Sequence, residues 1–261
     1  MKAHIGKFRD TSGKPKGLCY VPTALSFFLV EGFAFFFLSL KSPFEAAQLW
    51  PLAFGALWAV ILTGAMALLP GKAGKIGYGV LYFGAVIYAG FQTGYYILFS
   101  QMMWLSDFRY ASEGADYADV LLTYPVGWWL GLLGLIALGI AILRFTPKWE
   151  NRRKGRIVAL VLVMGAAFWA WKLPERVFAQ DADIRYAGSD YGRSQSAEAA
   201  YENMFNAHRL YQVCGLYQTF VKDVAENVLY PLTPSYAKAQ EAGREEIGNW
   251  FAEKGSRKVM P

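Results

Sequence analysis

The sequence predicts an all-α integral membrane protein, with five transmembrane helices followed by amphipathic surface helices on the extracytoplasmic side. Of the 261 residues, 55% are hydrophobic, which is too apolar for an ordinary soluble domain of this length. The apolar residues come in nearly uncharged blocks of roughly 18–25 residues, the length that crosses a bilayer at about 1.5 Å per residue. Lysine and arginine collect in some of the short connections between the blocks, as they do in cytoplasmic loops.

The membrane domain is predicted to cover residues 18–173, after a basic N-terminal arm of residues 1–17 that is expected to be cytoplasmic. Basic connections at Pro70–Lys75 and Lys148–Arg156 are also expected inside, whereas the acidic connection Gln101–Tyr124 is expected outside. This pattern places the N-terminus inside and the C-terminus outside. The five predicted spans are Leu18–Leu40, Trp50–Leu69, Ile76–Phe99, Pro125–Leu143 and Arg156–Leu173.

Glycines recur at helical spacing in two of the spans. Gly90 and Gly94 form one GxxxG pattern and Gly127 and Gly131 form another, a spacing that lets two helix backbones approach closely in lipid. We interpret both as packing positions, and whether they also support a homodimer stays open.

The tail divides into residues 174–234 and residues 235–261. In the first part, Ser194–Tyr211 and Leu216–Leu229 each place apolar residues on one helical stripe without being apolar all round. They are expected to lie flat on the outer leaflet or to cover another domain, and the tether to a membrane crossing favours the leaflet. Residues 235–254 predict a polar helix, and residues 255–261 a linker toward a further domain.

Glu31 is the most informative single residue, because a carboxylate inside an apolar span costs at least about 2.5 kcal/mol. It could anchor the bundle or contact a lipid headgroup. It could also be a protonated or hydrogen-bonded packing residue, with Gln92 or Tyr96 as its partner. The second interpretation is favoured.

The remaining polar residues predict no catalytic or metal centre in this chain. The acidic side chains of the outer loop (Asp107, Glu113, Asp116 and Asp119) lack a metal-ligand spacing, so a solvated loop is favoured over a cation site. His4 and His208 are isolated, and Cys19 and Cys214 are expected on opposite sides of the membrane. The formal charge of +6 is interpreted as a topology signal and not as a nucleic-acid-binding surface.

Three stretches together resemble the N-terminal half of the lipoteichoic acid synthase family, the membrane-anchored phosphoglycerol and related transferases of bacteria. They are LVEGFAFFFLSL in the first span, YYILFSQMMWLSDFRYASEGADYADV after the third, and NAHRLYQVCGLYQTFVKDV in the tail. The resemblance implies an extracytoplasmic, sulfatase-like catalytic domain with a threonine nucleophile and a divalent metal, usually manganese. The basic segment RKVMP would lead into that domain. Processing by signal peptidase after Ala239 is a further expectation.

The resemblance implies a membrane anchor and lipid-access domain of a cell-envelope transferase in the bacterial cytoplasmic membrane, not catalytic by itself. Its partners would be a phosphatidylglycerol-type lipid and the catalytic domain. Contacts with the lipid donor are expected from Glu31, Asp107, Arg109 and Arg209. The alternative is a stand-alone small transporter or scaffold protein, with Glu31 as an intramembrane ion or proton site.

Overall fold

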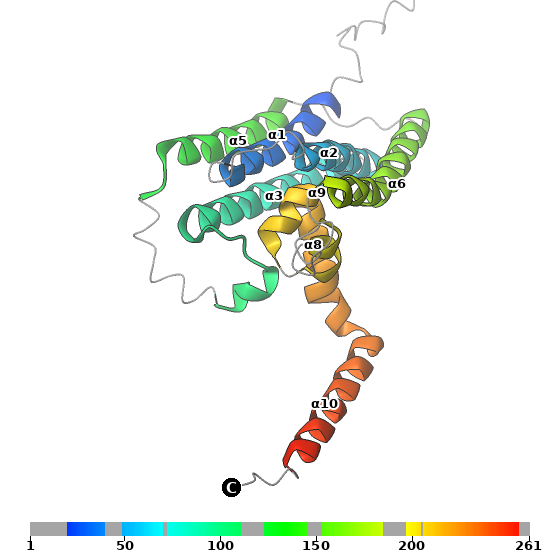
Figure 1. Cartoon of the computed structure of the whole chain (residues 1–261). Helices are drawn as coiled ribbons and strands as arrows, with labels where there is room; N and C mark the ends of the chain where they lie inside the picture. Colours follow the sequence, from blue (N-terminus) through cyan, green and yellow to red (C-terminus); the bar gives the residue numbers. More distant parts are fainter. Residues whose placement is uncertain are drawn as a thin grey trace, which may run out of the picture.

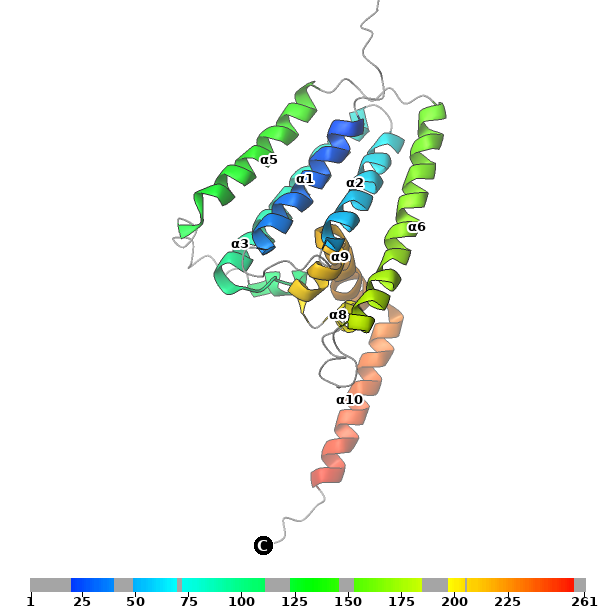
Figure 2. The same ribbon diagram turned by 45° about the horizontal axis from the view of Figure 1, so that its top comes forward.

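The computed structural model describes residues 20–39, 49–69, 72–110, 123–145, 153–184, 197–204 and 206–255, and within these ranges the regular structure is helical throughout. This confirms the all-α class. Five long helices lie side by side (Figures 1 and 2). They are α1 (Tyr20–Ser39), α2 (Trp50–Leu68), α3 (Lys72–Phe99), α5 (Val126–Phe145) and α6 (Arg153–Ile184).

Successive long helices run in opposite directions, with α2 between α1 and α6 and with α3 packed against α1 and α5 (Figure 2). One end of the bundle therefore carries the last residues of α1 and α3 and the first residues of α2 and α5. We call this the tail end, because the segments that follow α6 gather there.

Four of the predicted spans are confirmed as helices long and apolar enough to cross a membrane: Tyr20–Leu38, Trp50–Leu68, Val126–Phe145 and Arg156–Glu175. The third predicted span is helical within α3, but α3 is not among these four. Its 28 residues include five tyrosines, Gln92 and two lysines, which lower its hydropathy. The last span also continues beyond its expected end at Leu173, since α6 runs through Pro174 to Ile184.

The polar and aromatic side chains of α3 face its neighbours in the bundle. Tyr78 and Tyr82 pack edge-on against Phe27 of α1, with ring centroids 5.6 and 5.7 Å apart. On the side facing α5, the indole Nε1 of Trp128 donates a hydrogen bond of 2.8 Å to Thr93 Oγ1. Three of the tyrosines that make α3 less apolar, Tyr78, Tyr82 and Tyr96, are thus part of the core.

Glycines provide the close contacts around α5, as the packing interpretation predicted. A Cβ at Gly131 would lie 2.6 Å from the ring of Phe33, and one at Gly90 would lie 3.1 Å from Leu132. Gly127, in contrast, has no heavy atom within 4 Å of a built Cβ. Among the residues that the structure describes, Gly131 is therefore the contact position of the α5 pair, and Gly127 is not.

The tail forms further helices, which begin at the tail end of the bundle (Figure 1). They are α8 (Ala197–Asn203), α9 (Ala207–Asp223), the π-helix η4 (Val224–Leu229), the 3₁₀ turn η5 (Tyr230–Leu232) and α10 (Pro234–Gly255). The polar helix predicted for residues 235–254 is confirmed as α10, which leads away from the bundle. A further 3₁₀ helix, η2 (Leu105–Tyr110), follows α3.

The single helix predicted for Ser194–Tyr211 is wrong. Met204 has a positive φ of 50°, and the Asn206 side chain accepts a hydrogen bond from the backbone N–H of Arg209, so a new helix begins at Ala207. Asparagine is a preferred residue at this position, because its side chain satisfies one of the free N–H groups of the first turn. The chain therefore breaks between α8 and α9 and turns into the bundle.

Candidate functional site

Helix α9 consists of two half-helices that meet at Gly215. Its φ of 75° and ψ of 178° lie in a region that only glycine adopts without strain. A Cβ at this position would also lie 2.8 Å from the backbone oxygen of Pro51 in α2. The first half-helix comprises residues 207–214 and the second residues 216–223.

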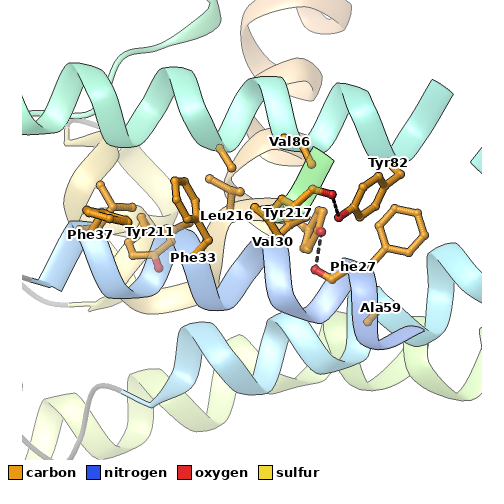
Figure 3. Close-up of a cluster of buried hydrophobic side chains, with 14 of the residues drawn as sticks. Phe27, Val30, Phe33, Phe37, Ala59, Tyr82, Val86, Tyr211, Leu216 and Tyr217 are labelled. Carbon is orange, nitrogen blue, oxygen red and sulfur yellow. Dashed lines mark hydrogen bonds between the residues drawn. The ribbon is translucent and has the colours of Figure 1, made fainter. Parts of the chain in front are cut away.

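The two half-helices form a re-entrant hairpin whose apex points into the bundle. Both outer ends are held near the end of α3. His208 stacks on Tyr96 with ring centroids 4.6 Å apart, and Asp223 Oδ2 accepts a hydrogen bond of 2.8 Å from the N–H of Leu105. The apex, in contrast, reaches α1, where the Tyr217 hydroxyl donates a hydrogen bond of 2.7 Å to the backbone oxygen of Phe27 (Figure 3).

Glu31 binds the apex of the hairpin. Its side chain is fully buried, and both carboxylate oxygens lie 3.0 Å from the N–H of Leu216, the first residue of the second half-helix. The N–H of Tyr217 also faces the carboxylate. A helix N-terminus carries free N–H groups and a partial positive charge, so a carboxylate from another helix can cap it. Glu31 is thus the remote N-cap of residues 216–223.

The surroundings of Glu31 are shaped to receive it. A Cβ at Gly55 of α2 would lie 2.4 Å from the Glu31 Cγ, so only glycine leaves room for the side chain there. The Tyr211 hydroxyl lies beside the carboxylate, although it has no hydrogen-bond geometry to a described group. Glu31 lies eight residues before the end of α1, about 12 Å along its axis. We call Glu31, Gly55 and the apex residues Gly215 and Leu216 the Glu31 latch.

The rest of the apex is buried against apolar side chains. Leu210, Cys214 and Leu216 have no exposed surface. Leu216 and Tyr217 project toward Val30 of α1 and Val86 of α3 (Figure 3). The expectation that the amphipathic stretches of the tail lie flat on a leaflet is therefore corrected for residues 207–223, because α9 is inserted among α1, α2 and α3. Non-helical backbone at such depth is tolerated where protein encloses it and satisfies its polar groups.

A second set of hydrogen bonds ties the ends of the hairpin to the turn after α3. The Gln92 side chain donates to the Met103 oxygen at 2.7 Å and accepts from the Met103 N–H at 3.0 Å. Burial raises the pKa of Asp223, while hydrogen bonds from Asn227 and from the Leu105 N–H partly oppose that rise. These contacts fix where the hairpin enters and leaves the bundle.

The partner expected for Glu31 is wrong, because Gln92 pairs with Met103, Tyr96 stacks on His208, and Glu31 bonds to Leu216. That it is a hydrogen-bonded packing residue is consistent with the structure. Glu31 lies at the apex of the hairpin, whereas the other residues expected to contact the lipid donor lie elsewhere.

Asp107 lies in η2, where its Oδ2 accepts a hydrogen bond of 3.0 Å from the Trp104 N–H. Arg209 is half-buried in the first turn of α9 and donates to Gln212 Oε1 at 3.3 Å. Arg109 belongs to η2 and Ala239 belongs to α10, and the structure describes the backbone of both residues but not their side chains. Glu113, Asp116, Asp119, His4 and Cys19 lie outside the described residues.

Cys214 is a free, buried cysteine, and within the described ranges no group of three or more His, Cys, Asp or Glu side chains could hold a metal ion. Comparison with protein families, curated proteins and solved structures finds no match for this chain. The Glu31 latch is therefore interpreted from its own geometry.

Two signals in the sequence could have located the latch. One is Gly215, a lone glycine between two amphipathic stretches. The other is the need of a buried carboxylate for N–H donors, which broken helices in membranes supply at their half-helix N-termini. Together they pair Glu31 with the residues after Gly215.

Proposed function

We propose that this chain is the membrane anchor and lipid-access domain of a bacterial cell-envelope phosphoglycerol-type transferase, similar to lipoteichoic acid synthase, and that it has no turnover of its own. The observation that carries the proposal is the Glu31 latch. It fixes the segment after the last membrane helix to the bundle, so that α10 starts from a defined position. A fixed exit point would hold a following extracytoplasmic domain at a constant place relative to the bundle, which supports the role of an anchor.

The proposed topology has five spans, with α3 as the additional one and with the tail end of the bundle on the extracytoplasmic side. The 28 residues of α3 extend about 42 Å, which is long enough to cross a bilayer. The proposed catalytic partner would bring a divalent metal, expected to be manganese, together with the sulfatase-like fold. Glu31 as a transported-ion site is less well supported, because both its carboxylate oxygens already face the Leu216 N–H.

One experiment tests the lack of turnover. The purified chain in phosphatidylglycerol liposomes is expected to release no diacylglycerol above background, because in this proposal the transfer chemistry belongs to the separate domain. Release above that of empty liposomes would contradict the proposal.

A second measurement tests lipid access. Photoreactive phosphatidylglycerol is expected to crosslink to the chain more strongly than matched photoreactive phosphatidylcholine, and Arg209→Ala is expected to reduce that preference severalfold. Equal crosslinking of the two lipids to the unmodified chain would refute selective access.

A further inference from the structure

His208 lies where the first half-helix of α9 enters the bundle. Its imidazole lies nearly parallel to two tyrosine rings: the ring of Tyr96 in α3 is 4.6 Å away at 15°, and that of Tyr211 is 6.4 Å away at 25°. Tyr211 in turn lies beside the Glu31 carboxylate. A row of aromatic rings therefore connects the first turn of α9 to the Glu31 latch.

The neighbouring hydrogen bonds define which ring nitrogen of His208 carries the proton. The Oε1 of Gln212 accepts from Arg209 at 3.3 Å, which leaves the amide Nε2 to donate to His208 Nε2 at 3.1 Å. Since an amide nitrogen only donates, His208 Nε2 must be unprotonated and Nδ1 must hold the hydrogen. Nδ1 is buried and has no hydrogen-bond partner among the described groups.

A second proton on His208 conflicts with this arrangement in three ways. The new Nε2–H would face the N–H of Gln212, so two donors would meet. The positive charge would lie beside Arg209, and it would be buried in the ring stack without a carboxylate partner in hydrogen-bond contact. Burial and, secondarily, Arg209 lower the pKa of His208 to about 4.

We propose that the contact of His208 with α3 is a pH-sensitive switch: protonation of the imidazole releases residues 207–214 from α3 and opens the Glu31 latch. The titratable and charged groups facing it are Arg209 and Tyr211 on α9 itself, Tyr96 on α3, and Glu31 on α1 behind Tyr211. The Tyr201 hydroxyl of α8 accepts a hydrogen bond from Gln218, which belongs to the second half-helix of α9 and not to the half-helix that carries His208. This inference does not rest on the transferase proposal.

The direction of the pH effect follows from the lowered pKa. The closed hairpin binds the proton less well than the open one, so closure is fully stable above about pH 6.5 and is weakened as the pH falls toward 4. With an ordinary pKa of about 6.5 in the open form, the open fraction is expected to rise about 20-fold between pH 7 and pH 5.

Cys214 is a natural reporter of this opening, because its thiol is buried near the apex of the hairpin. The full chain with Cys19→Ser, in detergent micelles, is treated with dithiodipyridine, which reacts with thiols at acid pH. Each rate is divided by that of the denatured chain at the same pH. The normalised rate is expected to be about 20-fold higher at pH 5 than at pH 7.

Two variants separate His208 from the other titrating groups. His208→Phe keeps an aromatic ring in the stack without a titratable nitrogen and is expected to remove the pH dependence. Gln212→Glu supplies a carboxylate to the protonated ring and is also expected to keep the hairpin closed at pH 5. An unchanged rate at pH 5 in the parent chain overturns the proposal, as does a parent-like pH dependence in both variants.

Discussion

Replacing Glu31 by alanine is expected to open the hairpin. The change leaves the buried N–H of Leu216 without its acceptor, which costs about 1–3 kcal/mol, and it adds a cavity where the side chain was. A total of about 3 kcal/mol corresponds to a roughly 100-fold larger open fraction, at about 1.4 kcal/mol per factor of ten. Glu31→Gln keeps an acceptor for the N–H in a side chain of the same size, so it is expected to cost only about 1 kcal/mol.

The thiol of Cys214 measures the effect at pH 7 in the Cys19→Ser background. Its normalised rate of modification should rise roughly 100-fold in Glu31→Ala and about fivefold in Glu31→Gln. Ser26→Ala is the matched control, because Ser26 is also a buried polar residue of α1 but bonds to Tyr78 at 3.0 Å and not to α9. A Glu31→Ala rate equal to that of the parent chain would refute the latch.

Two further substitutions test the surroundings of the latch. Gly55→Ala places a Cβ 2.4 Å from the Glu31 Cγ and should lower the free energy of unfolding by about 1–3 kcal/mol. The control Gly84→Ala, where a Cβ would have no atom within 4 Å, should be neutral or stabilising. Thermal unfolding in detergent compares the two variants, and equal melting temperatures would contradict the packing. Gln92→Leu removes both hydrogen bonds to Met103 and should speed hydrogen exchange at the Met103 amide by about tenfold, and unchanged exchange there would show that the bonds do not hold the turn.

The bounds of α2 and α10 could be predicted closely because each signal that defines them is local. The second span was expected at Trp50–Leu69 and is found at Trp50–Leu68, and the polar helix expected at residues 235–254 is found at Pro234–Gly255. Apolar runs of membrane length and a proline at a helix start are visible in a single stretch of sequence.

The candidate site could be predicted only in part, because its geometry depends on residues distant in the chain. The sequence singled out Glu31, but the donor it binds is a backbone N–H 185 residues later. A backbone group has no residue type of its own, so the sequence marks this donor only indirectly, through the glycine that precedes it. The break at Met204 was missed because helical spacing continues across it. The stretches on either side of Gly215 were predicted separately, but their spacing does not show that they turn back on each other and enter the bundle.

The Glu31 latch combines two features that are each unfavourable alone at this depth in the bundle. A buried carboxylate without donors and a half-helix whose first N–H groups lack acceptors both pay the cost of desolvation. Placed 3.0 Å apart, the carboxyl group satisfies the N–H of Leu216, and its oxygens face the positive end of the half-helix dipole. Gly55 and Gly215 make this approach sterically possible from two other helices. The polar residue in the first span is therefore explained by the break in α9, and the break in α9 is explained by that residue.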